Sequence, residues 1–414
     1  MKILIAHSRY RAGAPSGENR VVDSEAAALA AAGQDVTLFQ RHSDEIAGWP
    51  LTRKAALPAL SVYNPAVRRE LTDLLGRERP DVVHVHNTFP MLSASVLEAC
   101  RDAAVPVVAT MHNYRLACAS GDFFRDGQPC HACADGSVGA ALRHGCYRGS
   151  RAATVPVATA LLASRRSWRE LVSAYVFISV SQRDLLAGVG LPSERVFVKD
   201  NFVASPPVTA AGTTEGRGHL VSSLGRLDAA KGVPLLMAAW DHFRRANPRS
   251  PLRLAIAGDG PLMGRVRDWA TGHGSVDVLG HLSRPEATAL IARSLAVVVP
   301  SAWEETFGLV AVEAMAGGVA PIVPDRGSFP DLVTDGVDGA LFRPGEARDL
   351  AGLLADVDRA PERFVALGTR GRRTHAARFG QHTNIERLLG IYRYAIEHPA
   401  VGTPAPALAS GARP

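Results

Sequence analysis

Two carboxylates at a fixed spacing carry the strongest chemical signal in this sequence. Glu305 and Glu313 lie in the stretch SAWEETFGLVAVEAMAGG, Ser301 to Gly318, with seven residues between them. The stretch follows an apolar, strand-like run and predicts a turn at Gly308 and then a helix that a glycine pair ends. The amides of a first helical turn suit a phosphate, and an ionised carboxylate accepts hydrogen bonds from sugar hydroxyls. The spacing therefore favours a phosphate-and-sugar site, and a surface helix with two solvated glutamates is the alternative.

Three histidines follow or end predicted strands in the first half of the chain. His84 and His86 alternate with valines in PDVVHVH, so one of them is expected to face the core and to be structural. His112 comes directly after the predicted strand 105–110, at its carboxyl end. Open parallel sheets bind ligands at that end of their strands. A lone histidine is more often a packed or surface residue, but the position of His112 makes it the first candidate for a site.

Four cysteines are gathered in a short, turn-rich segment. Cys118, Cys130, Cys133 and Cys146 follow the pattern C-x11-C-x2-C-x12-C, and the fifth cysteine, Cys100, lies apart on a predicted helix. This spacing suits tetrahedral zinc, which would supply folding energy to a segment with little core of its own. The alternatives are thiols that hold no metal, an iron–sulfur cluster and a redox pair. We expect the metal to be structural and to take no part in the chemistry.

The elements around these residues alternate between strand and helix. The first unit of the pattern is the strand 2–6, the helix 21–32 and the strand 35–40, and strands recur after residue 218 at 219–224, 252–257, 276–279 and 295–300. This alternation predicts an α/β protein with parallel sheets. A chain of 414 residues is long for one domain, so two domains are the natural expectation.

The motifs resemble those of the retaining glycosyltransferases of family 4, which have the GT-B fold. The resemblance rests on Glu305-x7-Glu313 with the Phe307-Gly308 pair, on GRL-x3-KG at Gly225 to Gly232, on PDVVHVH and on the order of these motifs along nearly the whole chain. It implies two Rossmann-like, doubly wound parallel-sheet domains that face a cleft. It also implies an enzyme that moves a sugar from a nucleotide-diphosphate sugar to an acceptor, a hexosyltransferase of the EC 2.4 class.

The resemblance assigns roles to five residues. Arg226 and Lys231 match the pair that neutralises the donor diphosphate, whose charge grows as the glycosidic bond breaks. Glu313 matches the carboxylate on the ribose, Glu305 the one on the transferred sugar, and His112 the histidine that positions this sugar. No enzymic nucleophile is agreed for the family. Other residues expected at the donor are Gly17, Gly258, Gly260, Phe307, Gly308 and Leu309.

The same comparison sets expected domain boundaries. Residues 1–203 form the acceptor-side domain, with a Cys-rich insertion at 115–150 that departs from the minimal family pattern. Residues 204–218, rich in Pro, Gly, Ala and Thr, form a linker, and 219–382 form the domain that binds the donor. A last helix, 383–398, is expected to pack back on the first domain, and 399–414 to be a disordered tail.

Charge and hydropathy limit the partners. The net charge of +6 and the pI of 9.3 suit anionic ligands. Arg143 to Arg169 holds six arginines and no acidic residue, which is either a solvated helical face or a docking surface for an anionic membrane. No stretch is long and apolar enough for a membrane span, and the N-terminal MKILIAHS reads as a strand, so we expect a cytoplasmic protein that can associate with the inner face of the membrane.

The acceptor is the least determined partner. A glycan, a lipid-linked sugar and a small natural product all remain open, which is compatible with a role in polysaccharide biosynthesis. No cofactor is expected in catalysis, and nucleic acid is not expected because no binding motif accompanies the basic residues. Two rival functions are a GT-B sugar-nucleotide epimerase and a non-catalytic, zinc-stabilised protein that binds sugar nucleotides.

Overall fold

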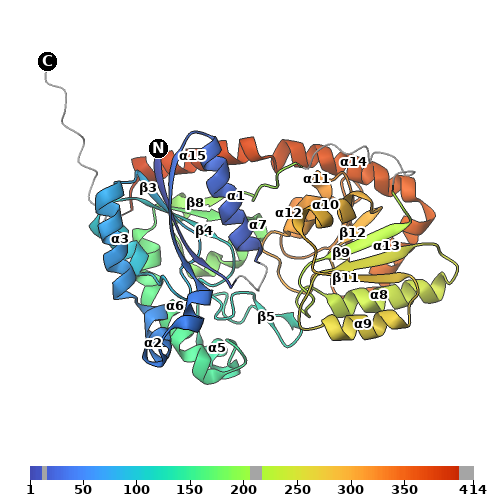
Figure 1. Cartoon of the computed structure of the whole chain (residues 1–414), viewed down its shortest axis with the longest axis horizontal. Helices are drawn as coiled ribbons and strands as arrows, with labels where there is room; N and C mark the ends of the chain where they lie inside the picture. The colour runs from blue at the N-terminus through green and yellow to red at the C-terminus, as the bar shows by residue number, and fades with distance from the viewer. Residues whose placement is uncertain (12–15, 206–216, 401–414) are drawn as a thin grey trace, which may run out of the picture. The chain divides into compact units, whose positions relative to one another are not determined.

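The computed structural model describes residues 1–11, 16–205 and 217–400, and these form two compact units (Figure 1). The first unit comprises Met1–Gly121, His131–Lys199 and the chain from Ile385 on, and the second comprises Asp122–Cys130 and Asp200–Asn384. Most of the expected linker, 204–218, and nearly all of the expected tail, 399–414, lie outside the described residues. The final helix α15 (Gln381–Glu397) belongs to the first unit from Ile385 on.

The first unit is built on a six-stranded parallel sheet with the order β2-β1-β3-β4-β7-β8. Three of its inner strands, β3, β4 and β7, are mostly apolar and buried along their whole length, as expected for a parallel sheet that is covered on both faces. The strands are β1 (Lys2–Arg9), β2 (Asp35–His42), β3 (Val82–Val85), β4 (Val107–Met111), β7 (Ala174–Phe177) and β8 (Val196–Val198).

Four helices of the first unit begin at polar residues whose side chains accept from the free backbone amides of the first turn. Ser16, Asn64, Ser150 and Ser179 each accept a bond from a backbone N–H in the first turn of the following helix. The helices are α1 (Gly17–Ala31), α2 (Leu51–Val62), α3 (Pro65–Glu78), α4 (Ser95–Asp102), α5 (Gly139–His144), α6 (Arg151–Leu171) and α7 (Val180–Leu185), with short 3-10 turns η1 (Ser43–Gly48), η2 (Ala187–Val189) and η3 (Ser193–Arg195).

The second unit has a parallel sheet of the order β11-β10-β9-β12-β13-β14. Its strands are β9 (Leu220–Leu224), β10 (Arg253–Ala257), β11 (Val276–Gly280), β12 (Ala296–Val298), β13 (Ala320–Pro324) and β14 (Ala340–Phe342). Its helices are α8 (Val233–Ala246), α9 (Met263–Thr271), α10 (Arg284–Ala292), α11 (Leu309–Ala316), α12 (Phe329–Leu332), α13 (Ala347–Arg359) and α14 (Pro361–Arg378).

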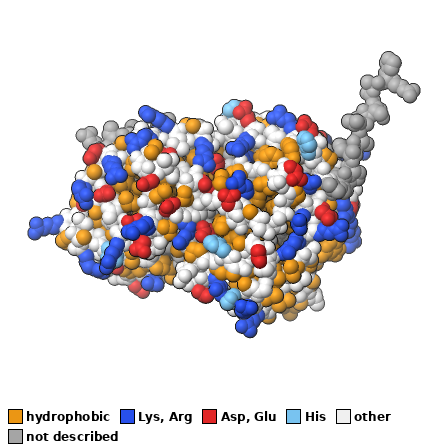
Figure 2. All heavy atoms as spheres, turned by 180° about the vertical axis from the view of Figure 1, so that it is seen from behind, with side chains coloured by type: hydrophobic (Ala, Val, Ile, Leu, Met, Phe, Trp, Pro, Cys, Tyr) orange, Lys and Arg blue, Asp and Glu red, His pale blue; other side chains and the backbone are white. Residues whose placement is uncertain are grey.

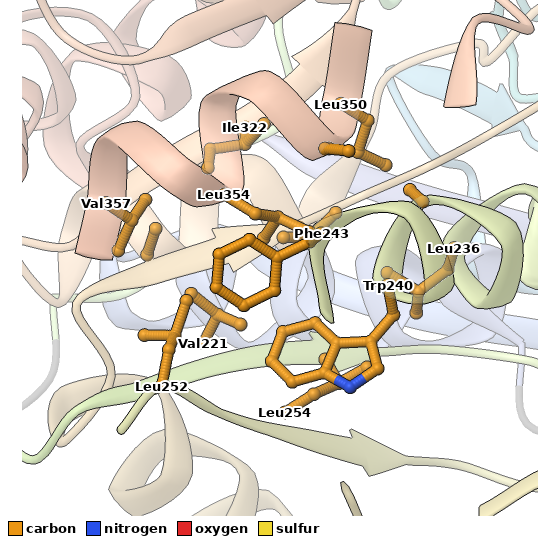
Figure 3. Packing of buried hydrophobic residues seen from close by; sticks show 14 of the residues in the cluster. Val221, Leu236, Trp240, Phe243, Leu252, Leu254, Ile322, Leu350, Leu354 and Val357 are labelled. Atoms are coloured by element: carbon orange, nitrogen blue, oxygen red, sulfur yellow. The ribbon is translucent and has the colours of Figure 1, made fainter. Parts of the chain in front are cut away.

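The core of the second unit lies between this sheet and the helices α8 and α13. Figure 3 shows the rings of Trp240 and Phe243, both from α8, packed with Leu354 and Val357 of α13 over the sheet. Both rings are fully buried, and their centroids are 5.2 Å apart. Burial of such side chains stabilises a fold by about 1.5–3 kcal/mol each. This packing holds the strands whose ends carry the predicted site.

The segment predicted as an insertion contains little regular structure. The hairpin of β5 (Phe124–Arg125) and β6 (Gln128–Pro129) belongs with the second unit, and α5 belongs with the first. Ala119, Cys133, Ala141 and Val157 form a small buried cluster in the first unit. None of the helices in the described part of the chain combines the length and the apolar character that a bilayer crossing requires.

Candidate active site

The predicted donor residues gather where the strand order of the second sheet reverses. β9 pairs with β10 on one side and with β12 on the other, so the topological switch point lies between β9 and β12. The loop Gly225–Gly232 follows β9, and the stretch from Ser301 to Gly308 follows β12. The sequence predicted both loops. Their juxtaposition comes from the strand pairing, which is a long-range property.

Backbone contacts lock these two loops together. The amide of Ala302 donates to the carbonyl of Ala230 at 2.8 Å. Gly232 adopts φ +73°, and a Cβ on it would lie 1.7 Å from the carbonyl oxygen of Pro300. Only glycine permits both the left-handed backbone and this approach. The close packing at Gly232 therefore sets the position of Lys231 over the residues that follow β12.

Lys231 and Glu305 meet at the centre of this arrangement. Lys231 Nζ lies 2.7 Å from Glu305 Oε1, and Glu305 Oε2 accepts bonds from Ser301 Oγ at 2.9 Å and from Trp303 Nε1 at 2.6 Å. The ammonium also lies 5.0 Å from the centroid of the Trp303 ring. Four residues thus fix the carboxylate and the ammonium in one place, with Glu305 buried and Lys231 partly exposed.

Arg226 joins this cluster through Asp228. Its guanidinium pairs with Asp228 Oδ2, and Asp228 Oδ1 accepts the backbone N–H of Lys231 at 2.8 Å. The side chain of Arg226 is 64% exposed. Arg226 and Lys231 therefore each have a carboxylate partner, Asp228 and Glu305. The predicted pair of cations is present, but its charge is balanced within the loops, which the sequence did not indicate.

The helix α11 begins beside Glu305, as the sequence predicted. Gly308 precedes it with φ +84°, and a Cβ there would lie 2.5 Å from the Phe329 ring. Phe307 is buried with its ring 6.1 Å from that of Phe379, so its side chain anchors the loop while the first-turn backbone, including Leu309, remains the predicted phosphate contact. Glu313 is half-buried on the same helix.

Gly258 and Gly260 support the loop that carries Arg226. A Cβ on Gly258 would lie 1.8 Å from the carbonyl oxygen of Gly225, and one on Gly260 would lie 2.6 Å from that of Leu227. Both glycines have positive φ. Their side-chain-free backbone therefore lets the loop after β10 press against the loop after β9. This packing alone explains why both positions are glycine. A contact of either glycine with the donor remains a prediction.

The first sheet has its own switch point, between β1 and β3, and histidines collect there. His7 comes from β1, His84 from β3, His86 from the end of β3 and His112 from the end of β4. All four are buried. We expected one of His84 and His86 to face the core, and both do. His86 Nδ1 lies 2.8 Å from His112 Nε2, and the planes of these two rings are inclined by 19°.

Sequence reasoning missed three residues that complete this cluster. Glu25, from α1, has its Oε1 3.2 Å from His84 Nδ1 and 3.3 Å from His86 Nε2. Lys199, which follows β8, lies 3.4 Å from Glu25 Oε2. Tyr392, from α15, has its hydroxyl 2.7 Å from His84 Nδ1, and the other nitrogen of His84 lies 2.7 Å from Thr110 Oγ1. A hydrophilic residue at a buried position of a helix was the only signal that could have marked Glu25.

Burial sets the charge state of this cluster. Burial and the neighbouring His84 lower the pKa of His86 to about 4, and burial together with His86 holds the pKa of His112 well below its usual value. Burial alone would raise the pKa of Glu25, but Lys199 and His84 outweigh it and keep the carboxyl ionised. His86 and His112 are therefore neutral near pH 7, beside an ion pair of Glu25 and Lys199.

A second carboxyl of the first unit lies at the start of α1. Gly17 begins this helix, and the next residue, Glu18, has a side chain only 9% exposed. Asn113 Nδ2 donates to Glu18 Oε2 at 3.3 Å. Burial raises the pKa of Glu18 to about 7, against the opposing effects of Asn113 and Arg115. Gly17 thus lies next to a carboxyl that changes its charge near neutral pH, and its contact with the donor stays a prediction.

His86 and His112 line a pocket within the first unit. The pocket has a volume of about 80 Å³, enough for several water molecules or part of a ring. Polar and aromatic side chains share its wall, among them Asn113, Arg115 and Trp168. Such a mixture can bind a hydroxylated group by hydrogen bonds and by contact with a ring face.

Cys133 and Cys146 both pack in the small cluster around Ala119 and Val157. Among these residues, the group of three His, Cys, Asp or Glu ligand atoms within 4.8 Å of one another consists of Glu25, His84 and His86 and contains no cysteine. Cys118 Sγ lies 3.1 Å from Ser120 Oγ. The zinc site of Cys118, Cys130, Cys133 and Cys146 stays a prediction.

Comparisons with known proteins agree with this architecture. Residues 15–204 match the family model described as Glycosyltransferase Family 4, and residues 211–374 match the one described as Glycosyl transferases group 1. The chain is 29% identical to the glycogen synthase of Mycobacterium tuberculosis, over 86% of this chain and 85% of that protein. It is 31% identical to a D-inositol 3-phosphate glycosyltransferase of Rhodococcus erythropolis, over 44% of this chain and 43% of that protein.

Solved structures share the fold at low sequence identity. Anabaena HepE in complex with UDP has a TM-score of 0.65 at 18% identity, covering 94% of this chain and 99% of that one. The sucrose-phosphate synthase of Thermosynechococcus elongatus has a TM-score of 0.67 at 19% identity, covering 95% and 98%. With two Rossmann-like parallel-sheet units and both family models matched, the chain belongs to the family 4 glycosyltransferases of the GT-B superfamily, enzymes that transfer a sugar from a nucleotide sugar.

Proposed function

We propose that this enzyme transfers a hexosyl group from a nucleoside diphosphate with retention of the anomeric configuration. The observation that carries the proposal is the cluster at the β9–β12 switch point, where Lys231, Glu305 and the start of α11 come together. A diphosphate and a sugar need this combination of ammonium, amides and carboxylate. Structures of HepE hold UDP and UDP-glucose, so UDP-glucose is the first donor to test.

The ion pair between Lys231 and Glu305 has a defined part in donor binding. A diphosphate that approaches α11 competes with Glu305 for the ammonium, since both are anions. When Lys231 turns to the phosphate, one oxygen of Glu305 becomes available to a sugar hydroxyl, while Ser301 and Trp303 keep the carboxylate in place. The exchange costs little because one charge-assisted contact replaces another. Before the donor binds, the ion pair with Glu305 keeps the side chain of Lys231 extended toward the phosphate site.

The transfer itself is a same-face substitution. The bond between the anomeric carbon and the diphosphate oxygen breaks, and the acceptor oxygen bonds to that carbon on the face that the diphosphate leaves. The proton of the acceptor hydroxyl passes to the departing diphosphate oxygen. Arg226, Lys231 and the first amides of α11 stabilise the charge that develops on the diphosphate. No protein nucleophile is needed for this step.

The acceptor side is assigned to the pocket of the first unit. His112 lines it, and its neutral imidazole can exchange hydrogen bonds with hydroxyls of the transferred sugar, the role predicted for it from the sequence, without attracting the diphosphate. The aromatic wall at Phe89 and Trp168 suits the apolar face of a sugar ring. The acceptor class that fits is a hydroxylated compound such as a glycan, a lipid-linked sugar or a natural product.

A peripheral membrane contact is assigned to α2 and α6, which pack on each other. Leu51, Val155 and Leu162 on these helices are 83%, 52% and 51% exposed. Arg166 of α6 pairs with Glu170, however, and Arg165 donates to the carbonyl of Gly136, so the helix carries less uncompensated charge than its sequence indicates. Figure 2 shows positive and negative side chains interspersed over one face. Insertion of the three apolar side chains into the bilayer is therefore the main contribution to membrane affinity. The double substitution Leu51→Ser with Leu162→Ser should abolish liposome binding, and Arg166→Ala should leave it largely intact.

Product analysis tests the transfer. The protein is screened by thermal shift against UDP-, GDP-, ADP- and dTDP-sugars, and the stabilising donor is incubated with candidate acceptors. We expect a glycoside whose anomeric configuration matches the donor by proton NMR, and loss of it in Glu305→Ala. An inverted product would refute retention. Release of a free epimer without an acceptor would instead identify an epimerase, and donor binding without any turnover would identify a binding protein.

A further inference from the structure

Four buried residues of the first unit contact one another in a line that ends at the pocket. Lys199 contacts Glu25, Glu25 contacts His86, and His86 contacts His112, at 3.4, 3.3 and 2.8 Å. Of these residues, His86 and His112 line the pocket, and Lys199 and Glu25 lie behind them. The expected chemistry of the family needs only a histidine at the sugar. It does not account for a buried ion pair and a second histidine behind it.

We propose that Glu25 acts through His86 to fix His112 in one tautomer, with the proton on Nε2 and the lone pair on Nδ1. Glu25 and His86 are positioning residues in this scheme, and His112 is the group that meets the hydroxyl. The effect on activity rests on the proposed function, whereas the tautomer itself does not.

The proton positions follow from what each atom can do. An ionised carboxylate only accepts, so the proton of His86 lies on Nε2, the nitrogen 3.3 Å from Glu25 Oε1. His86 is neutral and has one ring proton, so its Nδ1 is an acceptor. The bond of 2.8 Å between His86 Nδ1 and His112 Nε2 must then use a proton of His112. Because His112 is neutral too, its Nδ1 carries the lone pair.

Two atoms in the line have no aligned hydrogen-bond partner among the described residues, and they are Glu25 Oε1 and His86 Nε2. They lie 3.3 Å apart and are each buried, so a small rotation of the His86 ring would satisfy both. A metal ion is not the better complement of this group. The ammonium of Lys199 already contacts the carboxylate, and both nitrogens of His84 have hydroxyl partners at 2.7 Å.

Lys199 makes the substitution Glu25→Gln informative. An ammonium donates only, so Lys199 would hold the oxygen of the new amide and turn its NH₂ group toward His86. His86 Nε2 would then accept, its proton would move to Nδ1, and His112 Nε2 would become the acceptor. The substitution therefore reverses the tautomers of both histidines. Nδ1 of His112 then carries a proton, whereas in the wild type it carries the lone pair. Tyr392→Phe is the matched control, because it removes the hydroxyl partner of His84, a neighbour of Glu25, and leaves every residue of the line in place.

Imidazole ¹⁵N NMR of the full-length protein tests the proposal, with the signals of His112 identified by their loss in His112→Gln. In the wild type at pH 7.5, we expect a pyrrole-type shift for Nε2 and a pyridine-type shift for Nδ1. Glu25→Gln should exchange the two types and lower kcat/KM by about 10- to 100-fold, the range expected when a buried hydrogen bond is lost. Tyr392→Phe should leave the tautomer unchanged.

A protonated Nδ1 in wild-type His112 would overturn the proposal, whatever the activity. The wild-type spectrum needs no variant at Glu25, so the test stands even if Glu25→Gln does not fold. An unchanged tautomer in a folded Glu25→Gln protein would also overturn it. Failure of every nucleotide sugar to react would refute the proposed function instead, and would leave the NMR result as it is.

Discussion

The contact between Gly232 and Pro300 offers the sharpest test of how the donor site is built. Gly232→Ala places a Cβ 1.7 Å from the Pro300 carbonyl oxygen, and real Cβ contacts essentially never fall under 3.0 Å. The loop that carries Lys231 and the one that carries Glu305 must then separate by about 1.3 Å. A misplacement of about 1 Å in a catalytic site can reduce the rate by roughly 10²-fold. We therefore expect kcat/KM to fall by about two orders of magnitude.

The same substitution has a stability effect that a control variant can separate. Gly336 has φ +67°, close to that of Gly232, and nothing lies within 4 Å of a Cβ on it. Gly336→Ala therefore has only the backbone cost, roughly 1–2 kcal/mol. Gly232→Ala adds the steric cost of overpacking, about 1–3 kcal/mol, which lowers Tm by a further 2–12 °C at roughly 2–4 °C per kcal/mol.

Differential scanning calorimetry and steady-state kinetics with the best donor measure the two effects. Gly336→Ala should keep turnover near that of the wild type, and Gly232→Ala should not. Equal shifts in Tm for the two variants would refute the reasoning, because the steric term would then be absent. Full turnover in Gly232→Ala would show that the position of Lys231 does not depend on this contact.

Three further results are expected. Glu305→Gln should abolish most turnover, whereas Trp303→Phe removes one bond to the same carboxylate and should lower stability by about 1 kcal/mol, measured by kinetics and melting. Burial raises the pKa of Glu18 from 4.5 to about 7, so the folded state holds this proton more tightly, and its stabilising effect is lost as pH rises. The free energy of unfolding of Glu18→Gln should thus rise relative to that of the wild type by up to about 3 kcal/mol as the pH goes from 4.5 to 7. Parallel curves of unfolding free energy against pH for the two proteins would exclude this. Elemental analysis should find one zinc per chain, lost in Cys130→Ser with Cys133→Ser, and zinc-free protein from zinc-supplemented cells would contradict the prediction.

Local patterns in the sequence predicted the loops after β9 and β12 well. The order of apolar residues and glycines indicates a strand, a turn at Gly308 and then a helix. The helix α11 begins at Leu309, as expected. The candidate residues Lys231 and Glu305 lie 74 positions apart and still meet, because each lies in the loop that follows a strand and the two strands pair. Strand-end position was therefore a sufficient signal once the parallel fold was assumed.

Partners that come from distant elements could not be predicted. Glu25, Lys199 and Tyr392 lie on α1, after β8 and on α15, and no spacing relates them to His84. The sequence also overstated free charge, because Asp228 and Glu170 pair with Arg226 and Arg166. Residue counts give net charge, but only tertiary structure shows which charges are compensated.

The two units differ in the kind of polarity they offer, and this difference matches the two halves of a glycosyl transfer. The second unit presents ionised groups at its switch point, Lys231 and Glu305, which suit a charged diphosphate. The first unit presents neutral imidazoles, because burial prevents His86 and His112 from taking up a proton near pH 7. A cationic histidine there would compete for the diphosphate. Arg115 also lies in the wall of this pocket, but its guanidinium already donates to the carbonyls of Ala119 and Ser120. Under the proposed function, neutral imidazoles beside an internally compensated ion pair therefore suit hydroxyl groups, and the anion is left to the second unit.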